Sequence, residues 1–116
     1  MPKGFLVILT LAILLITGYL TLAVNNAFLK APSKSEIEVA VNQAQYFYRQ
    51  KKARNEDFSN GPCLSNALMP GWVVDIAHNP RLAMDDLSQN QCAAYLEGSA
   101  QHFVELDIDG NLIRVK

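Results

Sequence analysis

The densest group of polar side chains in this chain lies between positions 75 and 86. It combines carboxylates, an imidazole and a guanidinium, contributed by Asp75, His78, Arg81, Asp85 and Asp86. Carboxylates and imidazoles are the groups that proteins use for general acid–base catalysis, once geometry and pKa values are adjusted. In a loop, the same side chains also bond to their own backbone without any further role. The sequence therefore predicts a polar loop cluster that is a candidate site, and it assigns no reaction to it.

Two cysteines and two histidines form a second candidate set. Cys63, His78, Cys92 and His102 match in number the four ligands of tetrahedral zinc, but no two are close enough in sequence to share one loop. A cysteine nucleophile activated by one of the histidines stays open, because such partners meet in space. A disulfide fits the even cysteine count, and closing a loop of about 30 residues would stabilise the fold by roughly 3 to 4 kcal/mol. We expect a Cys63–Cys92 disulfide, with no metal, no cofactor and no catalytic residue.

A third candidate is the calcium-like segment Asp107-Ile108-Asp109-Gly110-Asn111. An EF-hand loop needs a bidentate Glu about twelve residues from its start, and no such Glu follows. Asp109-Gly110 instead suits a type I′ turn, in which both central residues have positive φ. The sequence predicts a hairpin of residues 102–108 and 111–116.

The alternation of this hairpin predicts its register and its two faces. Leu106 is expected opposite Ile113, Glu105 opposite Arg114, and Val104 opposite Val115. The apolar side chains then share one buried face: Val104, Leu106, Ile108, Ile113 and Val115. Glu105 and Arg114 form an exposed ion pair on the other face.

The elements that position these residues begin with an apolar N-terminal segment. No charged side chain occurs between Lys3 and Lys30, and residues 4–24 are apolar almost without interruption. As a helix, about 21 residues span roughly 31 Å, which is the thickness of the hydrocarbon core of a bilayer. A cleavable signal peptide has a shorter apolar region, and the best small-residue cleavage site here, Thr21-Leu22-Ala23, is weak. We expect residues 1–29 to be a retained transmembrane signal anchor that contacts the bilayer through residues 4–24.

The orientation of the anchor decides on which side of the membrane the remaining residues lie. Lys3 lies at one end of the helix, and Lys30 and Lys34 at the other, so the count of flanking positive charges does not choose between them. The short N-terminal tail and the even cysteine count favour a domain outside the cytoplasm; an inverted, cytosolic domain is the alternative. From Lys30 onward acidic residues outnumber basic ones by about two, which argues against a nucleic-acid partner.

A second, amphipathic helix follows a linker of residues 30–35. Ser35 and Glu38 form a capping box, and apolar residues then recur at spacings of three and four up to about residue 54: Ile37, Ala40, Val41, Ala44, Phe47 and Tyr48. Basic residues gather at the end of this helix: Arg49, Lys51, Lys52 and Arg54. Their positive charge is favourable at the C-terminal end of the helix, where the helix dipole is negative. Alternatively, they could contact anionic lipid or a cell-surface polymer.

Residues 36–116 are expected to form one small domain. Turn residues predict a loop over residues 60–71. Residues 72–77 are predicted to form a strand that begins with Trp72 in the core. Ser88 with Gln91 could cap a short helix that extends through Leu96. With the C-terminal hairpin, the predicted fold class is α+β: a transmembrane helix, an amphipathic helix and a small domain stapled by the disulfide.

Two families resemble parts of this chain. Lys3-Gly4-Phe5 before a long apolar helix resembles the leader of type IV pilins and pseudopilins, whose peptidase cuts between glycine and phenylalanine, although Leu9 stands where that family has Glu. The segments of residues 71–81, 89–92 and 102–107 are similar to small uncharacterised membrane-anchored proteins of reduced-genome bacteria. The second resemblance implies a bacterial cell envelope and transfers no site.

The function that these observations favour is non-enzymatic. We expect a protein that binds or scaffolds something in the cell envelope, with an unknown envelope protein or polymer as its partner. A type IV pilin-like or pseudopilin subunit and a small exported enzyme are the alternatives.

Overall fold

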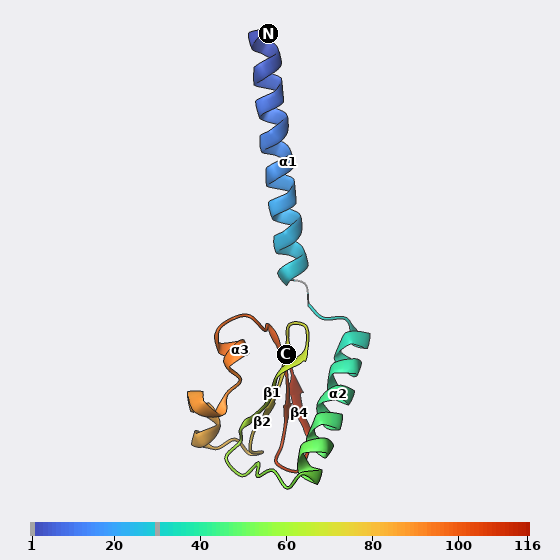
Figure 1. Ribbon diagram of the computed structural model, residues 1–116, viewed down its shortest axis with the longest axis vertical. Helices are drawn as coiled ribbons and strands as arrows, with labels where there is room; N and C mark the ends of the chain where they lie inside the picture. The colour runs from blue at the N-terminus through green and yellow to red at the C-terminus, as the bar shows by residue number, and fades with distance from the viewer. Residues whose placement is uncertain (1, 30) are drawn as a thin grey trace. The chain divides into compact units, whose positions relative to one another are not determined.

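The computed structural model describes residues 2–29 and 31–116, with the side chains of residues 23–29 left undescribed. The chain divides into two compact units, Met1–Pro32 and Ser33–Lys116 (Figure 1). The first unit contains α1 (Lys3–Leu29), in which the span Lys3–Leu22 is long and apolar enough to cross a membrane and has no buried residue. A signal sequence would have the same properties. Three threonine hydroxyls of α1 donate to carbonyls four residues earlier: Thr10 to Leu6, Thr17 to Ile13 and Thr21 to Thr17.

The second unit opens with α2 (Lys34–Ala53), which starts earlier than the sequence suggested. Its N-cap is Ser33 and not Ser35: the Ser33 hydroxyl accepts a hydrogen bond from the backbone N–H of Glu36 at 3.2 Å. Either serine has an acidic residue three positions later, so the pattern alone did not separate them. The buried face of α2 carries Ala40, Ala44 and Tyr48.

Four strands form one sheet in the order β1-β2-β3-β4: β1 (Cys63–Met69), β2 (Trp72–Ile76), β3 (His102–Leu106) and β4 (Leu112–Val115). β1 and β2 form an antiparallel hairpin, β2 and β3 are parallel, and β3 and β4 form a second antiparallel hairpin. The expected loop over residues 60–71 is therefore wrong, because most of it is β1. Pairing with β2 and burial of Leu64 and Leu68 outweigh a composition that is poor in strand formers.

The parallel pairing of β2 with β3 requires a crossover, which we define as residues 77–101. It contains two short 3-10 helices, η1 (Ala83–Asp86) and η2 (Ser88–Asn90), followed by α3 (Ala93–Leu96). The single helix expected between Ser88 and Leu96 is interrupted, because Gln91 and Cys92 have extended backbone conformations. In Figure 1, α2 and α3 lie on opposite sides of the sheet.

Each face of the sheet has its own core. Against α2 lie alternate side chains of the central strands, among them Trp72, Val74, Ile76, Val104 and Leu106. Against the crossover lie Val73, Cys92, Ala100 and Phe103. Two side-chain hydrogen bonds fix α2 on its face: the indole Nε1 of Trp72 donates to Glu36 at 2.8 Å, and the Tyr48 hydroxyl donates to the carbonyl of Ile108 at 2.8 Å.

The C-terminal hairpin is present, but its turn differs from the expected type I′ turn. Only Gly110 has a positive φ, +86°, and the Gly110 N–H donates to the carbonyl of Asp107. This pattern is a type I turn followed by a left-handed glycine, which makes the loop one residue longer. The Asp107 carboxylate accepts hydrogen bonds from the backbone N–H groups of Asp109 and Asn111. The calcium-like segment therefore uses this carboxylate to stabilise its own turn.

The longer loop and a bulge in β4 compensate each other in the register. Leu106 pairs with Leu112 and not with Ile113, whereas the pairs Glu105–Arg114 and Val104–Val115 are confirmed. Ile108 lies in the turn and is 37% exposed, so its expected place in the buried face is wrong.

Candidate functional site

One row of side chains crosses the whole sheet on the crossover face. Cys63, Asp75, Glu105 and Arg114 are successive partners in β1, β2, β3 and β4. Because neighbours in register share a face, the disulfide, two carboxyl groups and one guanidinium are placed side by side.

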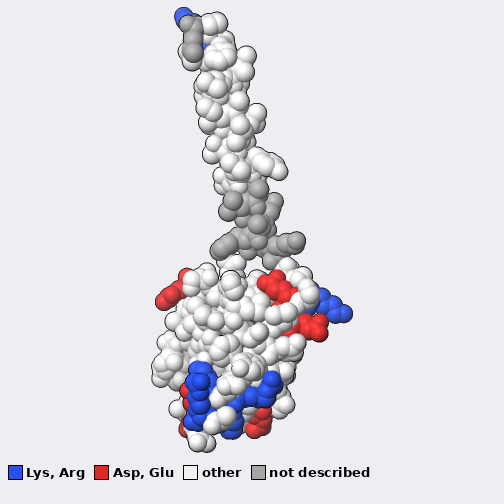
Figure 2. Space-filling model, turned by 45° about the vertical axis from the view of Figure 1, so that its right-hand side comes forward, with Lys and Arg blue, Asp and Glu red and all other residues white. Residues whose placement is uncertain are grey.

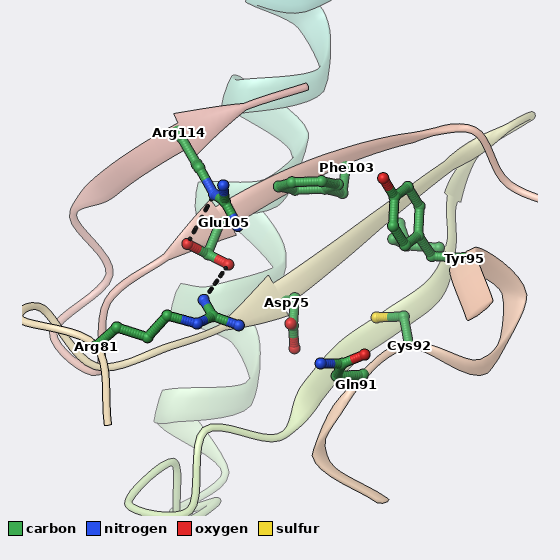
Figure 3. A pocket seen from close by; sticks show the side chains of 9 residues that line it. Asp75, Arg81, Gln91, Cys92, Tyr95, Phe103, Glu105 and Arg114 are labelled. Atoms are coloured by element: carbon green, nitrogen blue, oxygen red, sulfur yellow. Dashed lines mark hydrogen bonds and ion pairs between the residues drawn. The ribbon is translucent and has the colours of Figure 1, made fainter. Parts of the chain in front are cut away.

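Glu105 is the best-satisfied charge in this row. It is 4% exposed, and its two oxygens accept from Arg81 Nη1 at 3.1 Å and from Arg114 Nε at 3.2 Å (Figure 3). The Glu105–Arg114 pair had been expected on an exposed face. That expectation is wrong because the crossover covers this face and brings Arg81 as a second partner.

Arg81 links the crossover to the sheet. Besides Glu105, its guanidinium donates to the carboxylate of Asp86 at 2.9 Å and to the backbone carbonyl of Asp85 at 3.3 Å. Hydrogen bonds and ion pairs with these acidic groups outweigh its partial burial and raise the pKa of Arg81 above its ordinary value. Asp86 is exposed and serves to orient this guanidinium.

Asp85 organises the start of the crossover. Its side chain is fully covered and accepts from the His78 backbone N–H at 3.1 Å, from His78 Nδ1 at 2.9 Å and from the Leu82 N–H at 2.8 Å. Burial alone would raise the pKa of Asp85, but these hydrogen bonds hold it below its usual range. A side chain at Gly61 would collide with this carboxylate. Asp85 and His78 therefore form a structural brace.

Asp75 differs from the rest of the predicted cluster. Its Oδ1 is buried and accepts no hydrogen bond from any residue that the structure describes. Burial first, and then the neighbouring Glu105 carboxylate, raise the pKa of Asp75 to about 7, although the backbone N–H of Ile76 and the charge of Arg81 act in the opposite direction. A carboxyl group of this kind changes its protonation near neutral pH.

A pocket of about 90 Å³ opens beside Asp75. Its polar lining is Asp75, Arg81, Gln91, Glu105 and Arg114, and its apolar lining is Val73, Cys92, Tyr95 and Phe103. Tyr95 and Phe103 meet edge to face with ring centroids 5.0 Å apart, and the Arg114 guanidinium lies 5.1 Å from the Phe103 centroid. In Figure 3 the two rings stand together above Asp75, while Arg81 lies to its left and Gln91 to its lower right.

The predicted cluster is thus brought into one region but divided between two tasks. Asp75 and Arg81 line the pocket, whereas His78, Asp85 and Asp86 hold the crossover around it. Glu105, Gln91, Tyr95 and Phe103 were missed as site residues. Phe103 and Glu105 lie on one face because they are two residues apart in β3, but only the parallel pairing with β2 shows that Asp75 joins them.

The cysteines and histidines do not assemble into one site. The expected disulfide between Cys63 and Cys92 is confirmed. His78 bonds to Asp85, and the ring of His102 lies on the opposite face against Trp72, with centroids 4.9 Å apart. Among the residues that the structure describes, no group of three or more His, Cys, Asp or Glu side chains could hold a metal ion.

Basic side chains at the end of α2 are a separate surface feature. Lys51 lies 3.8 Å from Glu56, and Lys52 lies over the Phe58 ring. Figure 2 shows blue side chains gathered at one end of the domain with red ones among them. The mixed charge fits a solvated helix end better than a surface for a polyanion.

No family model, curated protein or solved structure matches this chain. The comparisons therefore support neither of the two resemblances.

Proposed function

We propose that this chain is a single-pass membrane protein of the cell envelope, whose disulfide-bonded domain lies outside the cytoplasm and binds a ligand or partner without transforming it. The observation that carries this proposal is the Cys63–Cys92 disulfide in a chain that begins with a helix apolar enough to cross a membrane. Disulfides persist in oxidising compartments, which lie on the far side of the cytoplasmic membrane.

The geometry of the pocket supports binding more than catalysis. Two of the carboxylates in this region are already engaged: Asp85 is fully covered and bonded to His78, and Glu105 is held by Arg81 and Arg114. A general acid or base has to reach the reacting group within hydrogen-bond distance, which a fully covered carboxylate cannot do. Asp75 is left as a polar anchor in a small, partly apolar pocket, which is the usual form of a binding site.

Thiol labelling in spheroplasts of a bacterial expression host tests the topology and the disulfide together. A membrane-impermeant maleimide should label no cysteine in intact spheroplasts, and both cysteines after treatment with an external reductant. The double variant Cys63→Ser, Cys92→Ser is the control for background labelling. Labelling that needs lysis but no reductant would place the domain in the cytosol and overturn the proposal.

The intact mass of the membrane-extracted protein separates the remaining alternatives. A retained anchor predicts the mass of the whole chain. A mature chain that begins at Phe5 would instead indicate processing of the pilin type, because that junction follows Gly4. Loss of the residues up to about Ala23 would indicate a cleaved signal peptide and a released domain.

A further inference from the structure

We propose that the pocket beside Asp75 binds a primary alkylammonium group, with the ammonium donating to Asp75 Oδ1 and the alkyl stem lying along Tyr95 and Phe103. The group could belong to a free amine or to a lysine side chain, since both present the same chemistry. This inference names a ligand for the binding role proposed above and rests on that proposal for its setting.

The hydrogen bonds that the pocket residues already make indicate which kind of ligand the pocket can bind. Glu105 already accepts from two guanidinium groups, and Arg81 already donates to three acceptors. Asp75 Oδ1 is the one buried side-chain nitrogen or oxygen atom without a hydrogen-bond partner in the part of the chain that the structure describes. A buried carboxylate oxygen without a donor is costly, so a ligand that supplies a donor gains more than one that supplies another acceptor.

The balance of charge favours a cation over an anion. The charged and titratable groups near the pocket are Glu105 from β3, Arg114 from β4, and Arg81, Asp85, Asp86 and Tyr95 from the crossover, while β1 contributes the disulfide-bonded Cys63. Together with Asp75 this makes four carboxyl groups against two guanidinium groups, and each guanidinium group is already paired with at least one carboxylate. An anionic ligand would meet this excess of negative charge, whereas an ammonium group reduces it.

The size and the walls of the pocket limit the rest of the ligand. A cavity of 150 Å³ is large enough for benzene, so about 90 Å³ accepts a shorter group such as a propyl stem with its ammonium. The edge-to-face pair of Tyr95 and Phe103 supplies an apolar wall for the alkyl stem.

Protonation of Asp75 should control this binding. The pKa of Asp75 is raised to about 7, first by burial and then by Glu105. An ammonium group needs the ionised carboxylate, so binding at pH 8 should release few protons, and binding at pH 5.5 should release nearly one proton per ligand. The affinity should fall roughly thirtyfold between pH 8 and pH 5.5, in proportion to the ionised fraction of Asp75.

The test is an NMR titration of the purified, disulfide-bonded full chain in detergent micelles. The amine probes are n-propylamine and Nα-acetyl-lysine-N-methylamide, and the controls of matched size are n-propanol and propionate. We expect saturable shifts of the backbone amides of Asp75, Phe103 and Glu105 with at least one amine, with a dissociation constant on the order of 1 mM for so small a ligand. Saturation with propylamine alone would indicate a free amine, and saturation with the lysine derivative a side chain of a partner.

Two variants decide whether Asp75 is the anchor. Asp75→Asn keeps the shape of the side chain and removes the charge, so it should abolish saturation with either amine. Asp109→Asn removes an exposed carboxylate outside the pocket and should bind as the parent does. The inference fails if neither amine saturates, if propanol or propionate binds equally well, or if Asp75→Asn keeps its affinity. Since the titration uses purified protein, any of these results would leave the labelling test of topology unaffected.

Discussion

Asp75 and Glu105 are direct neighbours in the parallel ladder of β2 and β3, yet only Glu105 is held by guanidinium groups. Both side chains face the crossover, but no described donor reaches Asp75 Oδ1. One carboxylate of the pair thus has two guanidinium partners, whereas the other is buried without a described donor to its Oδ1 and retains its proton up to about pH 7.

This difference predicts how stability depends on pH. The pKa of Asp75 is about 7 in the folded chain and 3.8 in the unfolded one, so the folded state binds the extra proton between these values. The contribution of Asp75 is therefore fully present below about pH 4 and is lost as the pH rises to 7. Asp75→Asn should flatten this dependence and raise the free energy of unfolding at pH 8 by between about 1 and 4 kcal/mol.

Chemical unfolding of the full chain in detergent micelles at several pH values between 4.5 and 8 measures this effect. Asp85 does not interfere in that range: its pKa is lowered, so its stabilisation is lost only as the pH falls below the ordinary value of 3.8. Parallel curves for the parent and Asp75→Asn would contradict the assignment of the raised pKa to Asp75.

Glu105→Gln should destabilise the domain by about 2 kcal/mol, because it removes a buried charge that two guanidinium groups share. Arg114→Gln is the matched control. Arg114 is half exposed and leaves Arg81 in place, so its loss should cost well under 1 kcal/mol. Unfolding free energies at pH 8 rank the two variants. A cost below about 0.5 kcal/mol for Glu105→Gln would mean that the crossover does not cover this face in solution.

Gly110→Ala should cost more than Gly98→Ala, although both glycines have nearly the same left-handed φ, +86° and +81°. Backbone strain of about 1 kcal/mol is common to the two variants. At Gly98 an added Cβ meets nothing, whereas at Gly110 it would lie 2.6 Å from the Tyr48 ring. The ring would have to move and release its hydrogen bond to Ile108. Equal melting temperatures for the two variants would show that Tyr48 does not pack against this turn.

Local patterns predicted the elements that are defined by neighbours in sequence. The apolar run gave α1, the spacing of Ala40, Ala44 and Tyr48 gave α2, and alternation gave the Glu105–Arg114 pair. The sequence pattern could not decide between two local structures that it fits equally well. Ser33 and Ser35 are both suitable N-cap residues, and Asp109-Gly110 is compatible with two types of turn.

Contacts between distant segments account for the rest. β1 has no apolar alternation, because Ser65, Asn66 and Ala67 interrupt it, and it becomes a strand only by pairing with β2. The parallel pairing of β2 with β3 brings Asp75 to Glu105 from far along the chain, and no local pattern reports such a contact. The polar cluster was therefore found, but its division into a pocket and a brace was not.

The disulfide should be a major part of the stability of the domain. Cys63 and Cys92 are 29 positions apart and join β1 to the crossover beside the pocket. The chain-entropy relation gives about 3 to 4 kcal/mol for a loop of this length. The double variant Cys63→Ala, Cys92→Ala and the reduced parent should both lose roughly this free energy of unfolding, measured in the same micelles. Agreement between the two would assign the loss to the crosslink and not to the substituted side chains. A loss below about 1 kcal/mol would mean that the brace of Asp85 with His78 and Leu82 suffices to hold the crossover in place.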